Sequence, residues 1–224
     1  MEEKIEKVKE FAEKLLKDNK CSAHNMDHVM RVYNNALLLA KDENVDMEVI
    51  RIAALLHDIG SIKEYESSTF DHAIEGAKLA EPFLEKLKLP KDKIQHILDC
   101  IVSHRYRTDQ KPKTEEAKII FDADKLETIG AIGIARVFVW IGRNNAHIYK
   151  KVNLDEYAKE NLGGKMNGRI QDRSKHSPQI NWETKDKFVL DFLYTKKAKQ
   201  IARKRYTFSE KFLDKLEREI EGLE

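Results

Sequence analysis

His57 and Asp58 are the residues in this sequence whose types and setting most directly suggest chemistry. They end an apolar run in the stretch AALLHDIGS, residues 53–61, just before a glycine. A buried ionisable group is costly unless it forms an ion pair or binds a metal. Neighbouring side chains on a helix point about 100° apart. The two groups can therefore share one ion only in a groove that other helices complete.

His28 and Asp124 are the candidates to complete such a groove. His28 lies in HNMDHVMRV, near the start of an amphipathic stretch, and Asp124 follows an apolar run in IIFDADKLETIG. Each has an ordinary alternative when taken singly. A histidine on a semi-apolar face is usually a hydrogen-bonded structural residue, and Asp124 could pair with a lysine. The residue types alone leave a metal site and ordinary packing both open.

Helices must position these side chains, because apolar residues recur at helical spacing along nearly the whole chain. We expect an all-α protein in which Asp46 is a helix N-cap and Gly60 stops a helix. The segment at 163–179 lacks apolar periodicity and predicts a long loop. The predicted helices span residues 3–18, 26–42, 46–58, 71–88, 91–105, 114–127, 128–144, 153–161, 183–195 and 196–222.

The length and composition fit one folded domain. The 224 residues are 41% hydrophobic and 36% charged, with a net charge of +2 that gives no overall field for nucleic acid or membrane. We expect one domain over residues 1–224. Its functional core is predicted at about residues 20–145, and the helices within residues 183–222 are expected to pack on that core.

The sequence also predicts a cytoplasmic protein without a membrane partner. The opening MEEKIEKVKE lacks the apolar core of a secretory signal. The most apolar stretch, TIGAIGIARVFVWIG, is too short to span a bilayer and contains Arg136. Cys21 and Cys100 lie outside any CxxC motif, so we expect two reduced thiols.

The order H…HD…D resembles the HD-domain superfamily of metal-dependent phosphohydrolases. His28 stands in HxxRV, His57 and Asp58 follow AALL, and Asp124 stands in DADKL. The resemblance covers nearly the whole chain and implies a single helical HD-domain bundle. Four flanking segments are similar to a bacterial and archaeal subgroup of predicted HD hydrolases: DHAIEGAKLA at 71–80, IVSHRYR at 101–107, DADKLETIGAIGIAR at 122–136 and TKKAKQIARKRYTFSEKFLDKLEREIEG at 195–222.

Three departures from the superfamily narrow the substrate that the resemblance implies. HDIGSIKEYESS lacks the Glu-Asp pair that (p)ppGpp hydrolases carry shortly after HD. SHRYR lacks the HHExxxGxGYP block of cyclic-di-GMP phosphodiesterases, and INWETK stands where the closest subgroup has NHFxxK. We therefore expect a nucleotide or another small phosphate ester or anhydride as the substrate.

The resemblance implies one divalent ion bound by His28, His57, Asp58 and Asp124. Two imidazoles and two carboxylates suit Mn²⁺, Fe²⁺, Co²⁺, Ni²⁺ or Zn²⁺ better than Ca²⁺. The set contains no cysteine, which argues against a closed structural zinc site. Four protein ligands on a six-coordinate ion leave room for a water and a phosphoryl oxygen, as metal-activated hydrolysis requires.

His72 and His104 correspond in order to ligands of a second metal in binuclear members of the superfamily. The residue next to His104 is Arg105, where the larger ligand set generally has a further histidine. We therefore expect a single ion. Asp58, His72 and His104 are predicted to be catalytic, with the two histidines donating hydrogen bonds to phosphate or protonating a leaving oxygen. The alternative is two surface histidines at helix ends.

Four basic residues are candidates for phosphate contacts: Arg31, Lys125, Lys165 and Arg169. Arg31 lies three residues after His28 and so shares its helical face. A buried salt bridge is the stronger expectation for Arg31. Lys125 is expected to point away from Asp124, and a charged loop such as the one carrying Lys165 and Arg169 is more often simply solvated.

The basic run KKAKQIARKRY supports a rival function. It could bind RNA, or the chain could be a non-catalytic module that senses a nucleotide on the same fold. However, Ala198, Ile201 and Ala202 recur at helical spacing in this run, which favours a helix packed on the protein with a charged outer face. We expect a phosphate-containing small molecule as the partner rather than nucleic acid. A homo-oligomer is compatible with the sequence.

Overall fold

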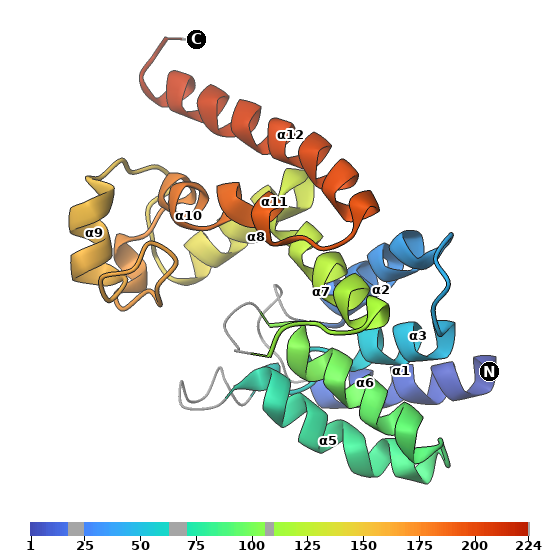
Figure 1. Ribbon diagram of the computed structural model, residues 1–224. Helices are drawn as coiled ribbons and strands as arrows, with labels where there is room; N and C mark the ends of the chain where they lie inside the picture. The colour runs from blue at the N-terminus through green and yellow to red at the C-terminus, as the bar shows by residue number, and fades with distance from the viewer. Residues whose placement is uncertain (18–24, 63–70, 106–109, 224) are drawn as a thin grey trace. The chain divides into compact units, whose positions relative to one another are not determined.

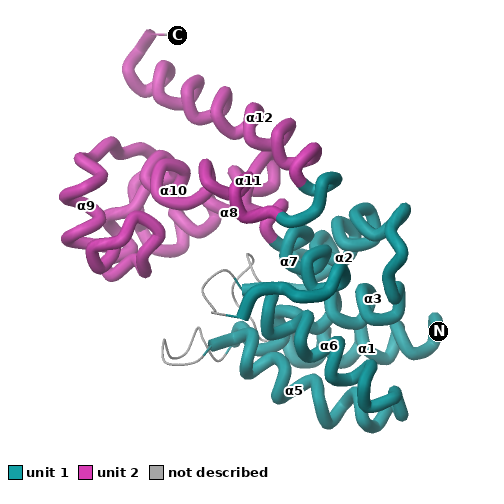
Figure 2. The backbone as a smooth tube through the Cα atoms, viewed as in Figure 1, with its two compact units in different colours: residues 1–124, 194–198 teal, residues 125–193, 199–224 magenta. Residues whose placement is uncertain are grey.

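The structure is a computed structural model that describes residues 1–17, 25–62, 71–105 and 110–223. All regular elements in these ranges are helices (Figure 1), so the prediction of an all-α fold is confirmed. No helix among them is long and apolar enough to cross a membrane. The chain divides into two compact units (Figure 2): residues 1–124 with 194–198, called unit 1, and residues 125–193 with 199–224, called unit 2.

Unit 1 is a bundle around α3. This central helix packs against α1, α2 and α6, and α5 packs against α6. The sequence of α3, MEVIRIAALL, is apolar around most of its circumference, and all five residues at 52–56 are buried. The helices of unit 1 are α1 (Glu2–Leu16), α2 (Met26–Ala40), α3 (Met47–Leu56), α5 (His72–Lys86), α6 (Lys91–Ser103) and α7 (Glu115–Lys125), whose last residue begins unit 2.

Side-chain caps start the helices α2, α3 and α5. Asp46 accepts hydrogen bonds from the backbone N–H groups of Glu48 and Val49 at 2.9 and 3.3 Å, which confirms the predicted N-cap of α3. Asn25 caps α2 through the backbone N–H of His28, and Asp71 caps α5. The capped first turns of α2 and α5 carry His28 and His72, so the caps also fix the backbone of two site residues.

Unit 2 has longer connections and a small core of its own. Buried Tyr157, Ala158, Leu162 and Ile180 pack together, with Ile170 against them. Helix α10 packs against α8 and α9. The helices of unit 2 are α8 (Gly130–Arg143), α9 (Leu154–Asn161), α10 (Pro178–Thr184), α11 (Val189–Phe192) and α12 (Lys196–Ile220), with the first turn of α12 in unit 1.

The predicted helix 183–195 is wrong. Ser177 caps an earlier start by accepting a hydrogen bond from the N–H of Ile180, and Pro178 occupies the first turn. Helix α10 then ends at Thr184, because Lys185 leaves the helical region at φ −140° and ψ −65°. A short 3-10 turn and α11 follow. The predicted loop at 163–179 is confirmed as far as Ser177, with one 3-10 turn at Arg173–Lys175 inside it.

Other predictions fall outside the described residues or end at a different residue in the structure. Residue 18 of the first predicted helix and Cys21 lie outside the described residues. Cys100 is a buried free thiol, and its burial raises the pKa of the thiol. The predicted helix 114–127 ends as an α-helix at Lys125 and continues as a 3-10 turn. One domain over residues 1–224 stays a prediction, because compact units can unfold together or separately.

Candidate metal centre

Five helices of unit 1 bring six ionisable residues to one place. His28 lies in the first turn of α2, and His57 and Asp58 directly follow α3. His72 is the first residue of α5, His104 follows α6, and Asp124 lies near the end of α7. Because α3 is enclosed by its neighbours, the turn after it emerges inside the unit, where His57 and Asp58 are 0% and 3% exposed.

Gly60 and Gly76 allow this turn to contact α5 through backbone atoms. A Cβ atom on Gly60 would lie 2.3 Å from the carbonyl oxygen of His72 and 2.5 Å from the nitrogen of Gly76. No side chain fits into that space. The contact places Asp58 beside His72. Gly60, which the sequence predicts as a helix stop, therefore also allows these two site residues to approach each other.

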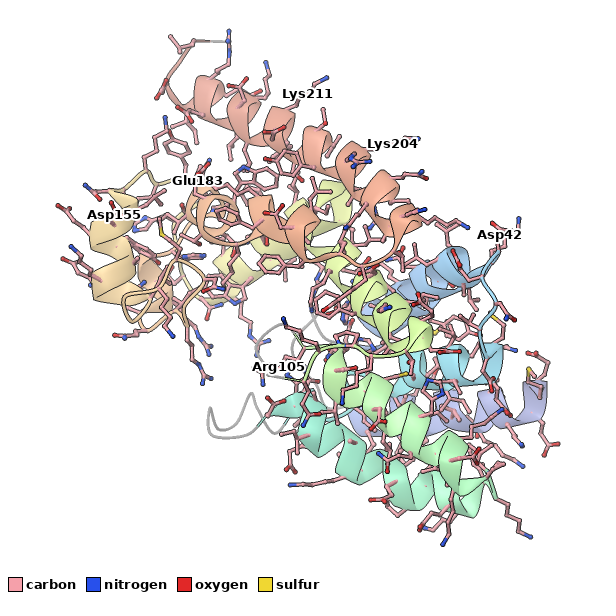
Figure 3. All side chains as sticks on the ribbon, in the orientation of Figure 1. Asp42, Arg105, Asp155, Glu183, Lys204 and Lys211 are labelled. Carbon is pink, nitrogen blue, oxygen red and sulfur yellow. The ribbon has the colours of Figure 1, made fainter. Side chains whose placement is uncertain are left out.

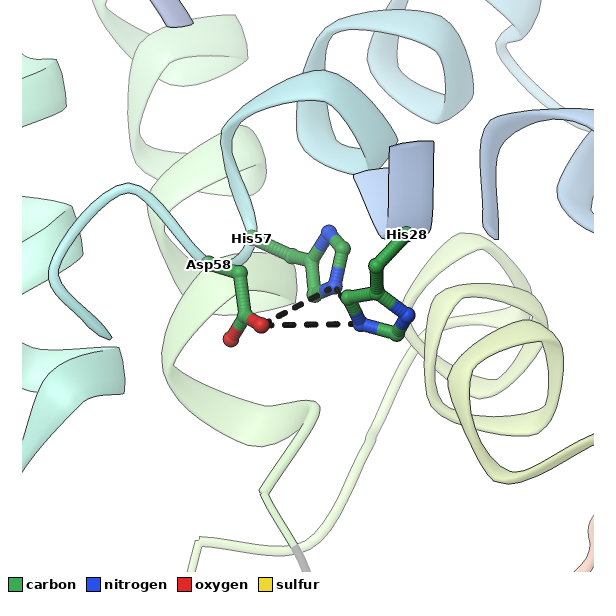
Figure 4. A group of neighbouring side chains, drawn as sticks. All are labelled: His28, His57 and Asp58. Atoms are coloured by element: carbon green, nitrogen blue, oxygen red, sulfur yellow. Dashed lines mark hydrogen bonds and ion pairs between the residues drawn. The ribbon is translucent and has the colours of Figure 1, made fainter. Parts of the chain in front are cut away.

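The first cluster consists of His28, His57, Asp58 and Asp124. The Nε2 atom of His28 lies 3.3 Å from Nε2 of His57, 3.5 Å from Oδ2 of Asp58 and 3.4 Å from Oδ1 of Asp124. Nε2 of His57 lies 3.9 Å from Oδ2 of Asp58. Figure 4 shows the two rings and the Asp58 carboxylate turned toward one another. Three donor atoms, from His28, His57 and Asp58, therefore converge, and Asp124 approaches the group at His28.

His57 is held in the tautomer that metal binding requires. Its Nδ1 lies 2.8 Å from the carbonyl oxygen of Ala54, and because a carbonyl oxygen only accepts, Nδ1 carries the proton. Burial lowers the pKa of His57 to about 4, so the ring is neutral at pH 7. The lone pair on Nε2 then points at the centre of the cluster. Metal-binding histidines commonly donate their other ring N–H to a backbone carbonyl in this way.

The same lone-pair argument shows that the first cluster fits a divalent ion. Two carboxylates and a bare imidazole nitrogen meet in a largely buried space, where their mutual proximity favours a bound cation. The donors are nitrogen and oxygen atoms, which suits transition metals.

A second cluster shares Asp58 with the first. Oδ1 of Asp58 lies 3.4 Å from Nε2 of His72 and 3.7 Å from Nε2 of His104, and the two Nε2 atoms are 3.1 Å apart. His104 donates its Nδ1–H to the carbonyl oxygen of Ile101 at 2.5 Å, so its Nε2 also carries the lone pair when the ring is neutral. Asp58, His72 and His104 thus form a three-donor group that could hold an ion.

Comparisons with known proteins agree on one family. The family model for the HD domain matches residues 25–129. An HD-superfamily hydrolase from Bacillus thuringiensis has a structure with a TM-score of 0.72 and 27% identity, covering 98% of each chain. A predicted HD superfamily hydrolase from an uncultured Thermotogales bacterium gives a TM-score of 0.64 and 26% identity, covering 96% of this chain and 91% of the other. Residues 25–129 of the chain therefore form an HD domain.

YpgQ of Bacillus subtilis is another full-length relative. It is 25% identical over 98% of this chain and 95% of its own length. A crystal structure of YpgQ in complex with ADP has a TM-score of 0.71 and covers 97% of this chain and 95% of that one, at 22% identity. The likeness to the fold of YpgQ therefore extends over both units of this chain.

The candidate phosphate contacts are distributed over both units. Arg31 is half-buried on α2, and Lys125 is half-buried at the end of α7. Lys165 and Arg169 are exposed in the loop of unit 2. A role for any of the four in phosphate binding stays a prediction.

Two residues near the candidate metal centre, Asp122 and Arg105, were not among the predicted site residues. Asp122 is fully buried, and its carboxylate accepts backbone hydrogen bonds from Tyr194 and Thr195. Arg105 forms an ion pair with Asp71, with 2.7 Å between Nη1 and Oδ2. The segment DADK gave a signal for Asp122, since a second aspartate two residues before Asp124 must face another direction on the helix. No local signal pairs Arg105 with Asp71.

Proposed function

We propose that this protein is a metal-dependent phosphohydrolase acting on a nucleotide or another small phosphate ester or anhydride. One observation carries the proposal: Nε2 of His28 lies within 3.5 Å of Nε2 of His57, of an Asp58 oxygen and of an Asp124 oxygen. The HD domain and the likeness to an HD-superfamily hydrolase support hydrolysis as the reaction class.

The four residues of the first cluster would hold the ion. A divalent ion at this place would supply an activated water and polarise a phosphoryl oxygen. His57 contributes a fixed lone pair, because its Nδ1–H is held by the Ala54 carbonyl. Asp58 contributes one oxygen to this cluster and turns the other toward His72.

We assign His72 and His104 to the substrate side of the site. In the tautomer that fits a 3.1 Å contact, His72 donates its Nε2–H to the lone pair of His104. Substrate phosphate can replace His104 as the acceptor, and a protonated ring can give its proton to a leaving oxygen. The competing assignment is a second ion at Asp58, His72 and His104, whose three donor atoms could hold one. Counting ions per chain distinguishes the two.

A nucleotide is the favoured substrate. The ADP complex of YpgQ supports nucleotide binding on this fold. Arg31, Lys125, Lys165 and Arg169 are the proposed phosphate contacts, with Arg31 one helical turn from His28. Lys165 and Arg169 are exposed, and if they bind the phosphates, replacing either residue should raise KM more than it lowers kcat.

The test is elemental analysis of the purified protein coupled to a nucleotide hydrolysis panel with each divalent metal. We expect retained transition metal, release of phosphate or pyrophosphate, and loss of activity with a chelator that the metal restores. Metal-activated hydrolysis forms no covalent phosphoenzyme. Trapping a phosphorylated histidine or aspartate during turnover would overturn the mechanism, and a metal-free active protein would overturn the proposal.

The alternative is a non-catalytic module that senses a nucleotide or binds RNA through α12. Lys204 and Lys211 are exposed on this helix (Figure 3), as RNA binding needs. Against it, Ala198 and Ala202 are fully buried and Arg205 donates to the carbonyl oxygen of Leu126, so the helix uses one face for packing. A salt-dependent gel shift with RNA, without hydrolysis of any nucleotide, would favour the alternative.

A further inference from the structure

Asp122 is a buried carboxylate with a defined pair of donors. Its side chain is 0% exposed, and Oδ1 and Oδ2 accept hydrogen bonds from the backbone N–H groups of Tyr194 and Thr195 at 2.9 and 2.7 Å. Both donors belong to the segment 194–198, which returns to unit 1 late in the chain. Each carboxylate oxygen therefore ties α7 to a segment about 70 residues away in sequence.

The position of the Tyr194 and Thr195 N–H groups, directly before α12, strengthens their hydrogen bonds to Asp122. Thr195 directly precedes α12 and accepts a hydrogen bond from the N–H of Ala198, so it caps that helix. The N-terminus of a helix carries partial positive charge, which favours a carboxylate there. Hydrogen bonds from backbone N–H groups to an ionised acceptor are also stronger than those between neutral groups. Asp122 thus links α7 to the residues directly before α12. We call these two hydrogen bonds, from the backbone N–H groups of Tyr194 and Thr195 to the Asp122 carboxylate, the clamp.

The two residues on either side of Asp122 reinforce the clamp. The ring of Phe121 packs edge to face on Tyr194 at 5.2 Å between centroids. The carbonyl oxygen of Ala123 accepts a hydrogen bond from Nδ2 of Asn35 on α2 at 3.2 Å. Three consecutive residues therefore fix this turn of α7, and the next residue is Asp124, 3.4 Å from His28.

We propose that Asp122 is a positioning residue for Asp124. The two side chains are separated by about 200° around the helix, so one faces α12 while the other faces the metal cluster. Holding one side of the turn sets the direction of the other. The inference rests on the proposed function, since it assigns Asp122 to the geometry of that metal site. Outer residues that orient metal ligands typically change metal affinity about 10–100-fold when removed.

The test compares Asp122→Ala and Asp122→Asn with Asn153→Ala. Asn153 accepts from the N–H groups of Asp155 and Glu156 at the start of α9, so its loss also removes two cap hydrogen bonds, but in unit 2. Mn²⁺ affinity is measured by calorimetry on metal-free protein well below each unfolding midpoint. The absorption spectrum of bound Co²⁺ reports the ligand geometry.

We expect Asp122→Ala to weaken Mn²⁺ binding at least tenfold, within the range for outer residues, and to alter the Co²⁺ spectrum. Asn153→Ala should lower the unfolding midpoint and leave both metal readouts at their wild-type values. Asp122→Asn keeps one acceptor and should give an intermediate affinity. Because the asparagine variant keeps the size of the side chain, it decides the question if the alanine variant does not fold.

Wild-type Mn²⁺ affinity and an unchanged Co²⁺ spectrum in a folded Asp122 variant would show that the residue only joins α7 to the segment before α12. Failure of the proposed function looks different. In that case Asp124→Ala also keeps wild-type metal binding, and the fault lies in the assignment of the metal site rather than in the clamp.

Discussion

Asp58 divides its two oxygens between two pairs of histidines. Oδ2 faces His28 and His57, and Oδ1 faces His72 and His104. One carboxylate therefore belongs to both clusters of the site. Its removal affects every arrangement that the geometry allows, whether one ion or two are bound.

Replacing Asp58 with alanine should abolish metal retention. The first cluster loses one of its two carboxylates, and the remaining donors leave less negative charge to compensate a divalent cation. We expect metal content to fall from about one ion per chain to near zero in elemental analysis. Asp99→Ala, an exposed aspartate on α6, is the matched control. Unchanged metal content in the Asp58 variant would show that the ligand assignment is wrong.

His72→Ala and His104→Ala should lower turnover and keep the metal. If the two histidines act on substrate, general acid–base or hydrogen-bonding roles predict a decrease in kcat of about 10²–10⁴-fold. The ion count should stay near one per chain. His147→Ala removes an exposed histidine of unit 2 and should leave both readouts unchanged. Two ions in the wild type, with one lost in either variant, would instead establish the binuclear site.

At the scale of elements, the contact between the turn after α3 and the start of α5 decides whether the two halves of the site meet. The turn carries Asp58, and α5 begins with His72. Gly60 makes the contact possible because the facing atoms are backbone atoms, which cannot rotate away as a side chain can. The prediction at this scale therefore concerns Gly60, which is neither a proposed metal ligand nor a proposed substrate contact.

Gly60→Ala should destabilise the protein and separate Asp58 from His72. The added Cβ would overlap the His72 carbonyl oxygen, and overpacking of this kind costs about 1–3 kcal/mol. Denaturant unfolding measures the loss, and metal titration measures the effect on the site. Gly142→Ala is the control, because a Cβ there meets nothing within 4 Å and alanine favours the helix. Equal stability of both variants would contradict the close-contact argument.

At the scale of the whole molecule, buried His176 and half-buried Asp186 of unit 2 affect stability in opposite directions. Burial lowers the pKa of His176 to about 4 and raises the pKa of Asp186 to about 7. Asn181 links them, with 3.4 Å from its Oδ1 to Nε2 of His176 and 2.6 Å from its Nδ2 to Asp186. Both shifts arise because removal from water disfavours the charged form.

The net pH dependence follows from proton binding. Between about pH 4 and 6.5, His176 binds a proton only in the unfolded chain, so it destabilises the protein as pH falls. From the ordinary pKa of 3.8 up to about 7, Asp186 binds a proton only in the folded chain, so it stabilises the protein as pH falls. Between about pH 4 and 6.5, the contributions of His176 and Asp186 to the pH dependence of the free energy of unfolding therefore oppose each other.

Asp186→Asn should remove the stabilisation that Asp186 contributes as pH falls, so that the destabilising contribution of His176 is no longer offset. Between pH 6.5 and 4, we expect the free energy of unfolding of the variant to fall faster than that of the wild type, by up to about 1.4 kcal/mol per pH unit. Urea unfolding at several pH values measures the difference, and a single transition would also support one cooperative domain. Parallel pH curves for the two proteins would show that Asp186 titrates normally.

The sequence by itself determined most of the helices and supplied the candidate donor set. Periodicity and caps are local properties, so α2, α3 and α5 could be placed within a few residues, and the HD order predicted His28, His57, Asp58 and Asp124 as ligands. Even the Nδ1 protonation of His57 and His104 depends on carbonyl groups only three residues earlier. These features need no knowledge of distant segments.

Tertiary structure decided everything that joins distant segments. Periodicity could not show that Pro178 starts a helix early and that Lys185 ends it, so the predicted helix 183–195 was wrong. The division of the Asp58 oxygens depends on where α2, α5 and α6 place their histidines around the turn after α3. The clamp from Asp122 to Thr195 spans 73 residues. Side-chain direction in such contacts is set by packing, which a single sequence does not encode locally.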